Sequence, residues 1–330
     1  MRGFSLNRIG LLGAVTILLT FASAGASEPP AAPSARFDPE KAGFALRFKQ
    51  EVSSYRVIAV FVLPQETLKL EVVEPPQAKE YLLESTAGNA TLGPSRPCLW
   101  QAPGATGLCP VKITDIQSGD SITLHVFVMV PYSQLTGEYL NGYRIGKYPT
   151  IPLKQLPMYK PPRGFVEVTR ENEETLVSPH FGLKQFLCKQ ASDFPKYLVL
   201  RERLLLKLEL ILEKLNAKGY DCSSLGVMSG YRTPYYNRAI GNVKYSRHLW
   251  GGAADIFVDR EPEDGMMDDL NNDGKIDYRD AAIVYDIVDG LYGEPFYVPF
   301  VGGLARYPLA ASHGPFVHVD VRGFRVRWGD

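Results

Sequence analysis

The sequence predicts an α+β protein in which a β-rich, sandwich-like half precedes a mixed half. From residue 37 to 163, short β-branched and aromatic runs alternate with Pro and Gly clusters, as in strands joined by turns. From residue 164 to 330, one stretch has leucine and isoleucine at helical spacing, and shorter apolar runs are typical of strands. With 330 residues, of which 45% are hydrophobic, the chain is long enough for two cores.

The chain begins with the features of an export signal. Arg2 and Arg8 form a charged region before an apolar run, Ile9–Phe21, and small residues that suit a signal peptidase follow it. The run is shorter than the roughly 20 residues that span a bilayer. We therefore expect a cleaved signal peptide over 1–26, no stable membrane anchor, and a periplasmic or secreted protein. Residues 27–36 are rich in Pro, Ala and Ser, which is typical of a linker.

The charge balance argues against one class of partner. Lysine plus arginine number 36, aspartate plus glutamate number 36, and the formal net charge is therefore 0. A nucleic-acid-binding protein needs a basic excess to neutralise phosphates, and this sequence has none. We expect no nucleic-acid partner.

Three runs in the first half are the clearest strand candidates, because they are rich in β-branched and aromatic residues. They are Tyr55–Leu63, Thr67–Val73 and Ser121–Val130. The one histidine of this half, His125, lies inside the third run, where a packed or surface role is favoured over chemistry. The Pro-rich segment Pro157–Pro162 is interpreted as a hinge. The turn-rich segment Leu140–Pro149 would fit a connection that lies over the second domain.

The second half contains one long predicted helix and two predicted strands. Apolar residues recur at helical spacing over Tyr197–Lys218, and Gly219 would end that helix. The run Leu225–Ser229 is interpreted as a short buried strand, and Phe316–Arg322 alternates as a strand does. The helix is assigned to the core, without a chemical role.

The cysteines favour disulfides, because the chain has an even number of them and is expected to be exported. They are Cys98, Cys109, Cys188 and Cys222. The short loop between the first two contains Pro and Gly and would close easily, so we predict Cys98–Cys109 and, with them paired, Cys188–Cys222. No pair has CxxC spacing, which argues against a cysteine zinc site.

Two of the five histidines lie in patterned segments with nearby acids. The segment SRHLWGGAAD at 246–255 contains His248 and Asp255, and FVHVD at 316–320 contains His318. Zinc accepts neutral imidazole and carboxylate, and a catalytic zinc site keeps three protein ligands and one free position. The glycines between His248 and Asp255 would allow a turn that brings both to one ion. From spacing alone, a zinc site and ordinary packed histidines both remain open.

Three motifs occur in order along the second half: SGYRT at 229–233, SxHxxGxAxD at 246–255 and HxD at 318–320. Together they resemble the M15 family of zinc D-Ala-D-Ala peptidases, in particular its periplasmic DUF882-type branch of murein endopeptidases. The Arg327-Trp328 pair after FVHVD is similar to that branch too. The resemblance covers about residues 175–330 and implies a hedgehog-like, D-Ala-D-Ala-peptidase-like zinc domain.

The resemblance implies a role for each matching residue. His248, Asp255 and His318 match the zinc ligands of the family. Arg232 matches the arginine that grips a substrate carboxylate or carbonyl, which suits a guanidinium fork. Ser246 matches a residue beside the substrate. The implied function is a zinc-dependent endopeptidase or carboxypeptidase that hydrolyses D-alanine-containing stem or crosslink peptides of peptidoglycan.

The sequence departs from the family at the general base. Many members carry Glu or His three residues before the last zinc histidine, and this chain has Pro315 there. His313 is our first candidate for the base, with an exposed loop residue as the alternative. Asp320 is the second, although on a strand it would share a face with His318 and could instead orient that ligand. The missing residue also leaves open a non-catalytic cell-wall-binding module that contains zinc and calcium. An adhesion or scaffold protein, in which the β-rich half and a calcium loop would matter most, is the other alternative.

Residues 269–280 match the calcium loop of EF-hands, with Gly274 at the sixth position for the sharp turn. The predicted Ca²⁺ ligands are Asp269, Asn271, Asp273, the Lys275 carbonyl, Asp277 and Asp280. Asp280 replaces the usual bidentate Glu, as in dockerin-type loops. We predict structural Ca²⁺ in an insertion of the zinc domain, followed by a helix over Tyr278–Leu291. An acidic turn without metal is the alternative.

Overall fold

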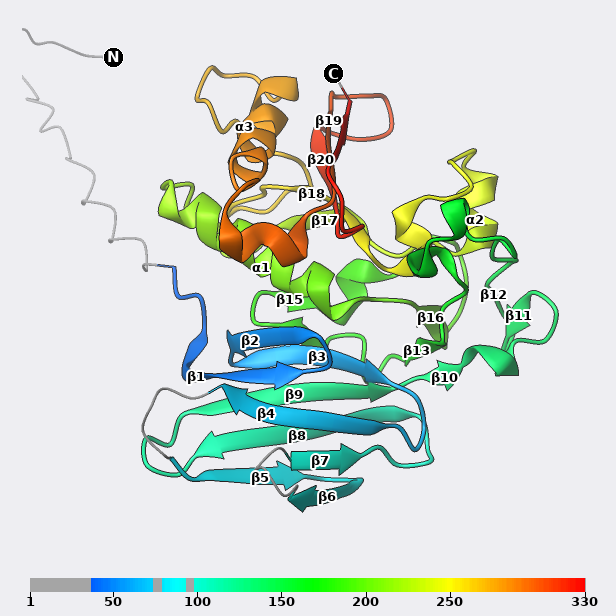
Figure 1. Cartoon of the computed structure of the whole chain (residues 1–330). Helices are drawn as coiled ribbons and strands as arrows, with labels where there is room; N and C mark the ends of the chain where they lie inside the picture. The colour runs from blue at the N-terminus through cyan, green and yellow to red at the C-terminus, as the bar shows by residue number, and fades with distance from the viewer. Residues whose placement is uncertain (1–36, 74–78, 93–97, 330) are drawn as a thin grey trace, which may run out of the picture. The chain divides into compact units, whose positions relative to one another are not determined.

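The computed structural model describes residues 37–329 except 74–78 and 93–97 (Figure 1). The predicted signal peptide at 1–26 and linker at 27–36 lie outside these residues. Within the described part of the chain, no helix combines the length and apolar character needed to cross a membrane.

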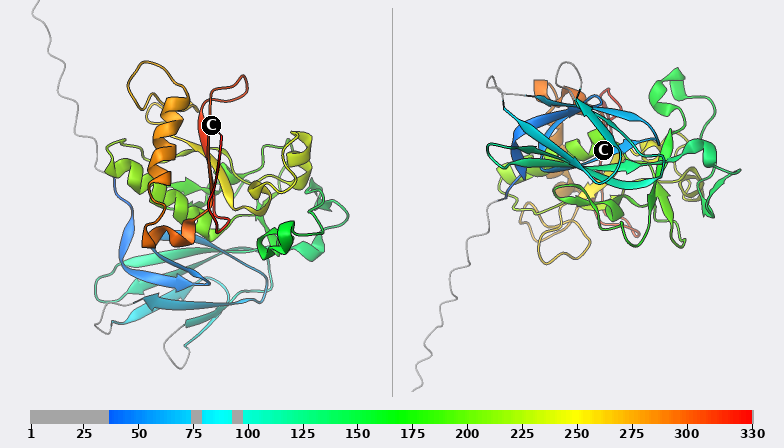
Figure 2. Two further views of the ribbon diagram at one scale, coloured as in Figure 1. Left: turned by 45° about the horizontal axis from the view of Figure 1, so that its top comes forward. Right: turned by 90° about the horizontal axis from the view of Figure 1, so that it is seen from below.

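Two sheets build the β-rich half and lie against one another (Figures 1 and 2). One has the strand order β2-β1-β4-β7-β6 and the other has the order β3-β9-β8-β5. The strands are β1 Lys41–Phe48, β2 Glu51–Tyr55, β3 Val57–Val62, β4 Thr67–Val73, β5 Tyr81–Ser85, β6 Asn89–Leu92, β7 Cys98–Gln101, β8 Gly107–Asp115 and β9 Ser121–Val128. Alternate residues of β4 point inward, whereas nearly all of β3 is buried because α1 also covers it.

All three predicted strand regions are present, one of them at the predicted bounds and two with different bounds. Thr67–Val73 is β4 as predicted, whereas Tyr55 ends β2 and the next run is β3. The third run stops at Val128, and Val130 begins the short strand β10 (Val130–Pro131) that leaves the sheet. His125 is partly buried, and its Nδ1 lies 2.7 Å from the Leu176 carbonyl oxygen, which agrees with a structural role.

A five-stranded sheet forms the centre of the second half, with the order β17-β18-β20-β19-β21. Its strands are β17 Gly226–Ser229, β18 Ala253–Phe257, β19 Gly303–Tyr307, β20 Phe316–Asp320 and β21 Val326–Trp328. The helices α1 (Glu202–Ala217) and α3 (Tyr278–Asp289) pack against each other, and α3 lies on β19 and β20. Many strands and few helices agree with the predicted α+β class.

Shorter elements complete the fold. They are β11 Tyr139–Leu140, β12 Tyr143–Arg144, β13 Gly164–Val168, β14 Leu176–Ser178, β15 Phe181–Gly182, β16 Lys196–Leu198 and α2 Pro234–Ala239, with 3-10 turns η1 Tyr132–Gln134, η2 Leu153–Gln155, η3 Pro157–Tyr159, η4 Leu183–Phe186, η5 Arg247–Trp250 and η6 Pro295–Phe300. The predicted long helix starts later than expected, because Tyr197 belongs to β16 and pairs with Glu167 of β13. The helix after the acidic loop ends at Asp289 rather than Leu291.

The two halves touch along α1. Tyr55 donates a hydrogen bond to Glu213, and Lys49 pairs with Glu202 at 2.5 Å. The described residues between 37 and 329 belong to one compact unit, and β13 pairs with β10 on one side and β16 on the other. The division into domains at 163 and 164 stays a prediction.

The structure contains neither predicted disulfide, since all four cysteines have free thiols. Cys98 lies on β7 and Cys109 on β8, and these strands belong to different sheets. The Sγ of Cys188 contacts the side chain of Gln190, whereas Cys222 is held by Asn216 near the end of α1.

A buried ion pair predicts how stability depends on pH. His180 Nδ1 lies 2.7 Å from a carboxylate oxygen of Glu209, which is fully buried on α1. Burial lowers the pKa of His180, but the hydrogen bond and charge of Glu209 outweigh it, so the net pKa is raised above 6.5. A raised histidine pKa contributes stability that is complete below the unfolded pKa and is lost as pH rises through the folded pKa.

We therefore expect the melting temperature to fall as pH rises from about 6 to about 9, and the fall to be smaller in His180→Gln. Thermal unfolding across that range measures it, with His125→Gln as the control. Equal pH dependence in wild type and His180→Gln would contradict this assignment.

Candidate metal centre

Strand register brings two predicted zinc ligands side by side. Asp255 of β18 pairs directly with His318 of β20, and Asp255 Oδ1 lies 2.7 Å from His318 Nδ1. His248 comes from the turn η5 and places its Nε2 3.2 Å from each of those two atoms. All three side chains are buried. The structure thus gathers the three residues that the motifs singled out.

A glycine turn explains how His248 and Asp255 reach one point. Gly251 ends η5 in the left-handed conformation, with φ 61°. A Cβ there would lie 2.2 Å from the Val199 carbonyl oxygen, so only glycine fits without a shift. The chain then reverses into β18, as the glycines in the motif predicted.

Neighbouring acceptors orient both histidine rings. The Nδ1 of His248 lies 2.6 Å from the Gly230 carbonyl oxygen and donates to it, which leaves Nε2 as an acceptor. The Nε2 of His318 faces Asp320 Oδ2 at 3.4 Å, which leaves Nδ1 toward Asp255. Such outer partners fix the ring nitrogen that can bind a metal.

The charges around the centre suit a cation. Burial lowers the pKa of His248 despite the charge of Asp255, which favours the neutral imidazole that binds zinc. Burial raises the pKa of Asp255, but the two histidines outweigh it and hold that pKa well below its usual range. The carboxylate is therefore ionised.

The donor set fits zinc. Ligand atoms of His248, Asp255 and His318 all lie within 4.8 Å of one another. Three buried side chains whose ligand atoms converge in this way could hold a cation between them, and two imidazole nitrogens with one carboxylate oxygen match a catalytic zinc site. Among the described residues, this is the one group of three or more His, Cys, Asp or Glu side chains that meets in this way.

Arg232 holds the oxygen of Asp255 that does not face the histidines. Its Nη2 lies 2.5 Å from Asp255 Oδ2, and its Nε donates to Ser229 Oγ at 2.8 Å. Thr233 then caps α2 by accepting from the Tyr236 backbone N–H. The motif resemblance assigned Arg232 to substrate alone, and no sequence signal indicated its contact with Asp255.

Ser246 stands at the start of η5, where its backbone accepts from the Leu249 N–H. It is buried beside the metal-binding turn, but its side chain makes no cap hydrogen bond to η5. Its predicted substrate contact stays a prediction.

Asp320 is fully engaged by protein donors. Its carboxylate accepts from the Gly303 N–H at 2.8 Å and from the Arg322 Nε at 2.8 Å. Burial raises its pKa, but His318 and Arg322 outweigh burial and hold that pKa far below normal. The indole of Trp328 lies 5.1 Å from the His318 ring and 5.2 Å from the Arg322 guanidinium. Sequence reasoning missed Gly303 and Arg322 and gave Trp328 no role at the centre.

His313 lies in the loop between β19 and β20 and is half-buried. Its Nδ1 is 2.8 Å from the Gly314 carbonyl oxygen, and its ring meets Phe316 edge-on at 5.0 Å. Phe316 and His318 are two residues apart on β20 and therefore share a face of the sheet. The loop thus places His313 on the side of the sheet that carries the metal centre.

The predicted calcium loop is closed by its own hydrogen bonds. Asp269 accepts from the Gly274 N–H at 2.7 Å, and Gly274 has φ 78° as the sharp turn requires. Asp280 is buried and accepts from the N–H groups of Leu270 and Asp277, both at 2.8 Å. Ca²⁺ at this loop stays a prediction.

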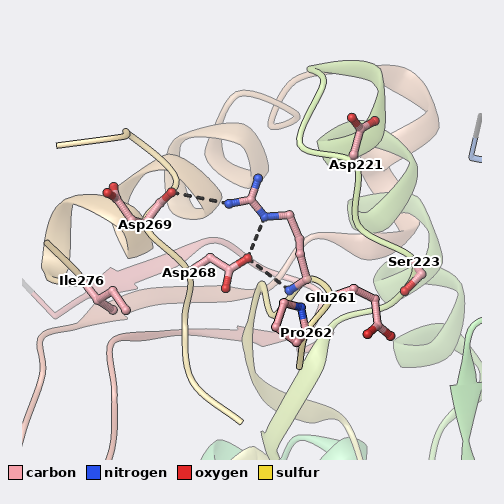
Figure 3. Close-up of a pocket in the computed structure, with 8 residues that line it drawn as sticks. Asp221, Ser223, Glu261, Pro262, Asp268, Asp269 and Ile276 are labelled. Carbon is pink, nitrogen blue, oxygen red and sulfur yellow. Dashed lines mark hydrogen bonds and ion pairs between the residues drawn. The ribbon is translucent and has the colours of Figure 1, made fainter. Parts of the chain in front are cut away.

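A hollow of about 500 Å³ lies next to this loop (Figure 3). Arg260 lines it and donates to Asp268 Oδ2 at 2.6 Å. None of the zinc-centre residues lines it. Its lining is Asp221, Ser223, Arg260, Glu261, Pro262, Asp268, Asp269 and Ile276.

Comparison with known proteins supports the peptidase class. Residues 179–277 match the family model Peptidase M15. The match includes SGYRT, His248 and Asp255 and ends before His318. No protein in the curated set matches the chain. The matched residues are less than half of the chain, and they support a peptidase of the M15 family without indicating a branch or a substrate.

Proposed function

We propose that this chain is an exported zinc-dependent peptidase that hydrolyses D-alanine-containing stem or crosslink peptides of peptidoglycan, as an endopeptidase or a carboxypeptidase. The convergence of His248, Asp255 and His318 carries the proposal. Zn²⁺ bound there would polarise the scissile carbonyl and lower the pKa of a water molecule. The motifs similar to the DUF882-type branch support the choice of substrate.

Other residues around the centre have separate proposed roles. The three ligands would hold the ion, and Arg232 fixes the second oxygen of Asp255, while its other N–H groups could hold a substrate carbonyl or carboxylate. We assign Asp320 to the orientation of His318, because its carboxylate is engaged by Arg322 and Gly303 and resists protonation. His313 is then the candidate that takes the proton from water.

Product analysis tests the function. Purified sacculi incubated with the zinc-loaded protein should release peptides whose masses identify the bond cut. The same digest with His248→Ala serves as the control, since this variant lacks a ligand. The absence of new products, together with binding to sacculi, would instead favour a non-catalytic cell-wall-binding module. The observation that favours this alternative is Pro315, which stands where many members of the family carry the general base.

We further propose that the loop 269–280 binds structural Ca²⁺ through the oxygen atoms that the EF-hand pattern predicts. A ligand that binds only the folded state stabilises it by about 2.7 kcal/mol at a hundredfold excess over its Kd. We therefore expect Ca²⁺ to raise the melting temperature of the wild type and a calcium-selective chelator to lower it. Asp269→Asn should lose most of this response. Equal melting temperatures with Ca²⁺ and with chelator would contradict the site.

A further inference from the structure

Two short segments surround the ligand His248 and are bound to each other. The first is 229–233, which carries Arg232, and the second is 246–251, which carries His248 itself. The His248 ring donates to the Gly230 carbonyl oxygen at 2.6 Å, and the Arg232 N–H donates to the His248 carbonyl oxygen at 3.3 Å. The direction of His248 Nε2 therefore depends on how these two segments lie relative to each other.

A third contact between them comes from a distant part of the chain. The hydroxyl of Tyr148 donates to the Leu249 carbonyl oxygen at 2.8 Å and lies 2.9 Å from the hydroxyl of Tyr231. A phenol has a single proton, so Tyr231 is the donor in the second bond. Leu249 follows His248, and Tyr231 stands between Gly230 and Arg232. One hydroxyl thus joins both segments.

Packing and hydrogen bonds hold Tyr148 in place. Tyr148, Tyr231 and Leu249 are all buried, and the Tyr148 ring meets the edge of Trp250 at 5.8 Å. The segment before it is held to α2, because the Tyr235 N–H donates to the Ile145 carbonyl oxygen at 3.0 Å. Figure 1 shows this segment, after β12, beside α2.

We propose that Tyr148 is a positioning residue for the metal centre: its hydroxyl holds the segments 229–233 and 246–251 in the register that aims His248 and Arg232. The proposal rests on the proposed zinc function. Tyr148 lies outside the residues that match the peptidase family model, so the connection between the two halves supplies part of the support of the site.

Removal of the hydroxyl would leave two buried groups unpaired. In Tyr148→Phe the Leu249 carbonyl loses its side-chain donor and Tyr231 loses its acceptor, while the ring and its packing on Trp250 remain. Relaxation of the two segments would turn His248 away from its partners. Loss of an outer partner of a metal ligand typically weakens metal binding about 10- to 100-fold.

The test measures zinc affinity by competition with a chromophoric chelator, in full-length protein, for wild type, Tyr148→Phe, Tyr231→Phe and the double variant. The visible spectrum of the Co²⁺-substituted proteins reports ligand geometry. We expect each single variant to bind zinc about tenfold more weakly with an altered Co²⁺ spectrum. The double variant should be no weaker than about the worse single variant, because both changes break the same bridge.

Tyr143→Phe is the matched control. Tyr143 is equally buried in the same connection, and within the described part of the chain its hydroxyl donates to neither segment. Its variant should keep wild-type zinc affinity and Co²⁺ spectrum. If Tyr148→Phe lowers only the melting temperature, with the affinity and spectrum of wild type, the positioning role is wrong and Tyr148 is purely structural.

The same experiment separates this inference from the function on which it rests. Wild-type protein that binds zinc but releases no peptides would overturn the peptidase, and the affinity series would still decide the role of Tyr148. Wild-type protein that binds no zinc would overturn both.

Discussion

Asp255→Asn is expected to abolish stoichiometric zinc binding and to lower peptide hydrolysis by at least about 10³-fold, since the Lewis acid contributes several kcal/mol and each 1.36 kcal/mol is tenfold in rate. Asp255 has two functions that an amide cannot combine. The Oδ1 atom lies beside His318 Nδ1 as the predicted ligand atom. The Oδ2 atom pairs with Nη2 of the buried Arg232 guanidinium at 2.5 Å.

The change should also reduce stability, because Arg232 would keep its charge in a buried site without an anion. Zinc content after dialysis and the rate of product release measure the two effects. Asp268→Asn is the matched control, since Asp268 also pairs with an arginine, Arg260, but lies outside the zinc centre. Full zinc content in Asp255→Asn would refute the ligand assignment.

His313→Ala is expected to lower turnover by at least about 10²-fold while zinc stays bound, the usual contribution of a general base. The loop that carries His313 packs on Phe316, which shares a face of β20 with His318. His313 is not one of the three predicted zinc ligands, so the zinc content of His313→Ala should equal that of wild type.

Zinc content and turnover, measured on the same preparation, distinguish catalysis from metal loss. His125→Ala provides a control for the loss of an imidazole elsewhere, because His125 lies in β9. Near-normal turnover in His313→Ala would remove this residue from the mechanism and leave the base to be found among other groups at the centre.

Local patterns in the sequence predicted those features that local forces determine. Thr67–Val73 is a strand at the predicted bounds because alternate residues bury one face. The glycines after His248 predicted a turn, and Gly251 indeed adopts a positive φ. The leucines at helical spacing predicted the body of α1 but not its start, since pairing of β16 with β13 takes Tyr197 out of the helix.

The sequence by itself determined the candidate ligand residues, their motifs and the α+β class, because these follow from residue chemistry and short-range periodicity. Only the tertiary structure decided which partners orient those residues. Arg232 pairs with Asp255, Arg322 pairs with Asp320, and Tyr148 joins the two segments around His248. The structure also leaves all four cysteines with free thiols, contrary to the predicted pairing. These contacts join residues distant in the chain, and their geometry depends on packing of the whole fold, which no local pattern encodes.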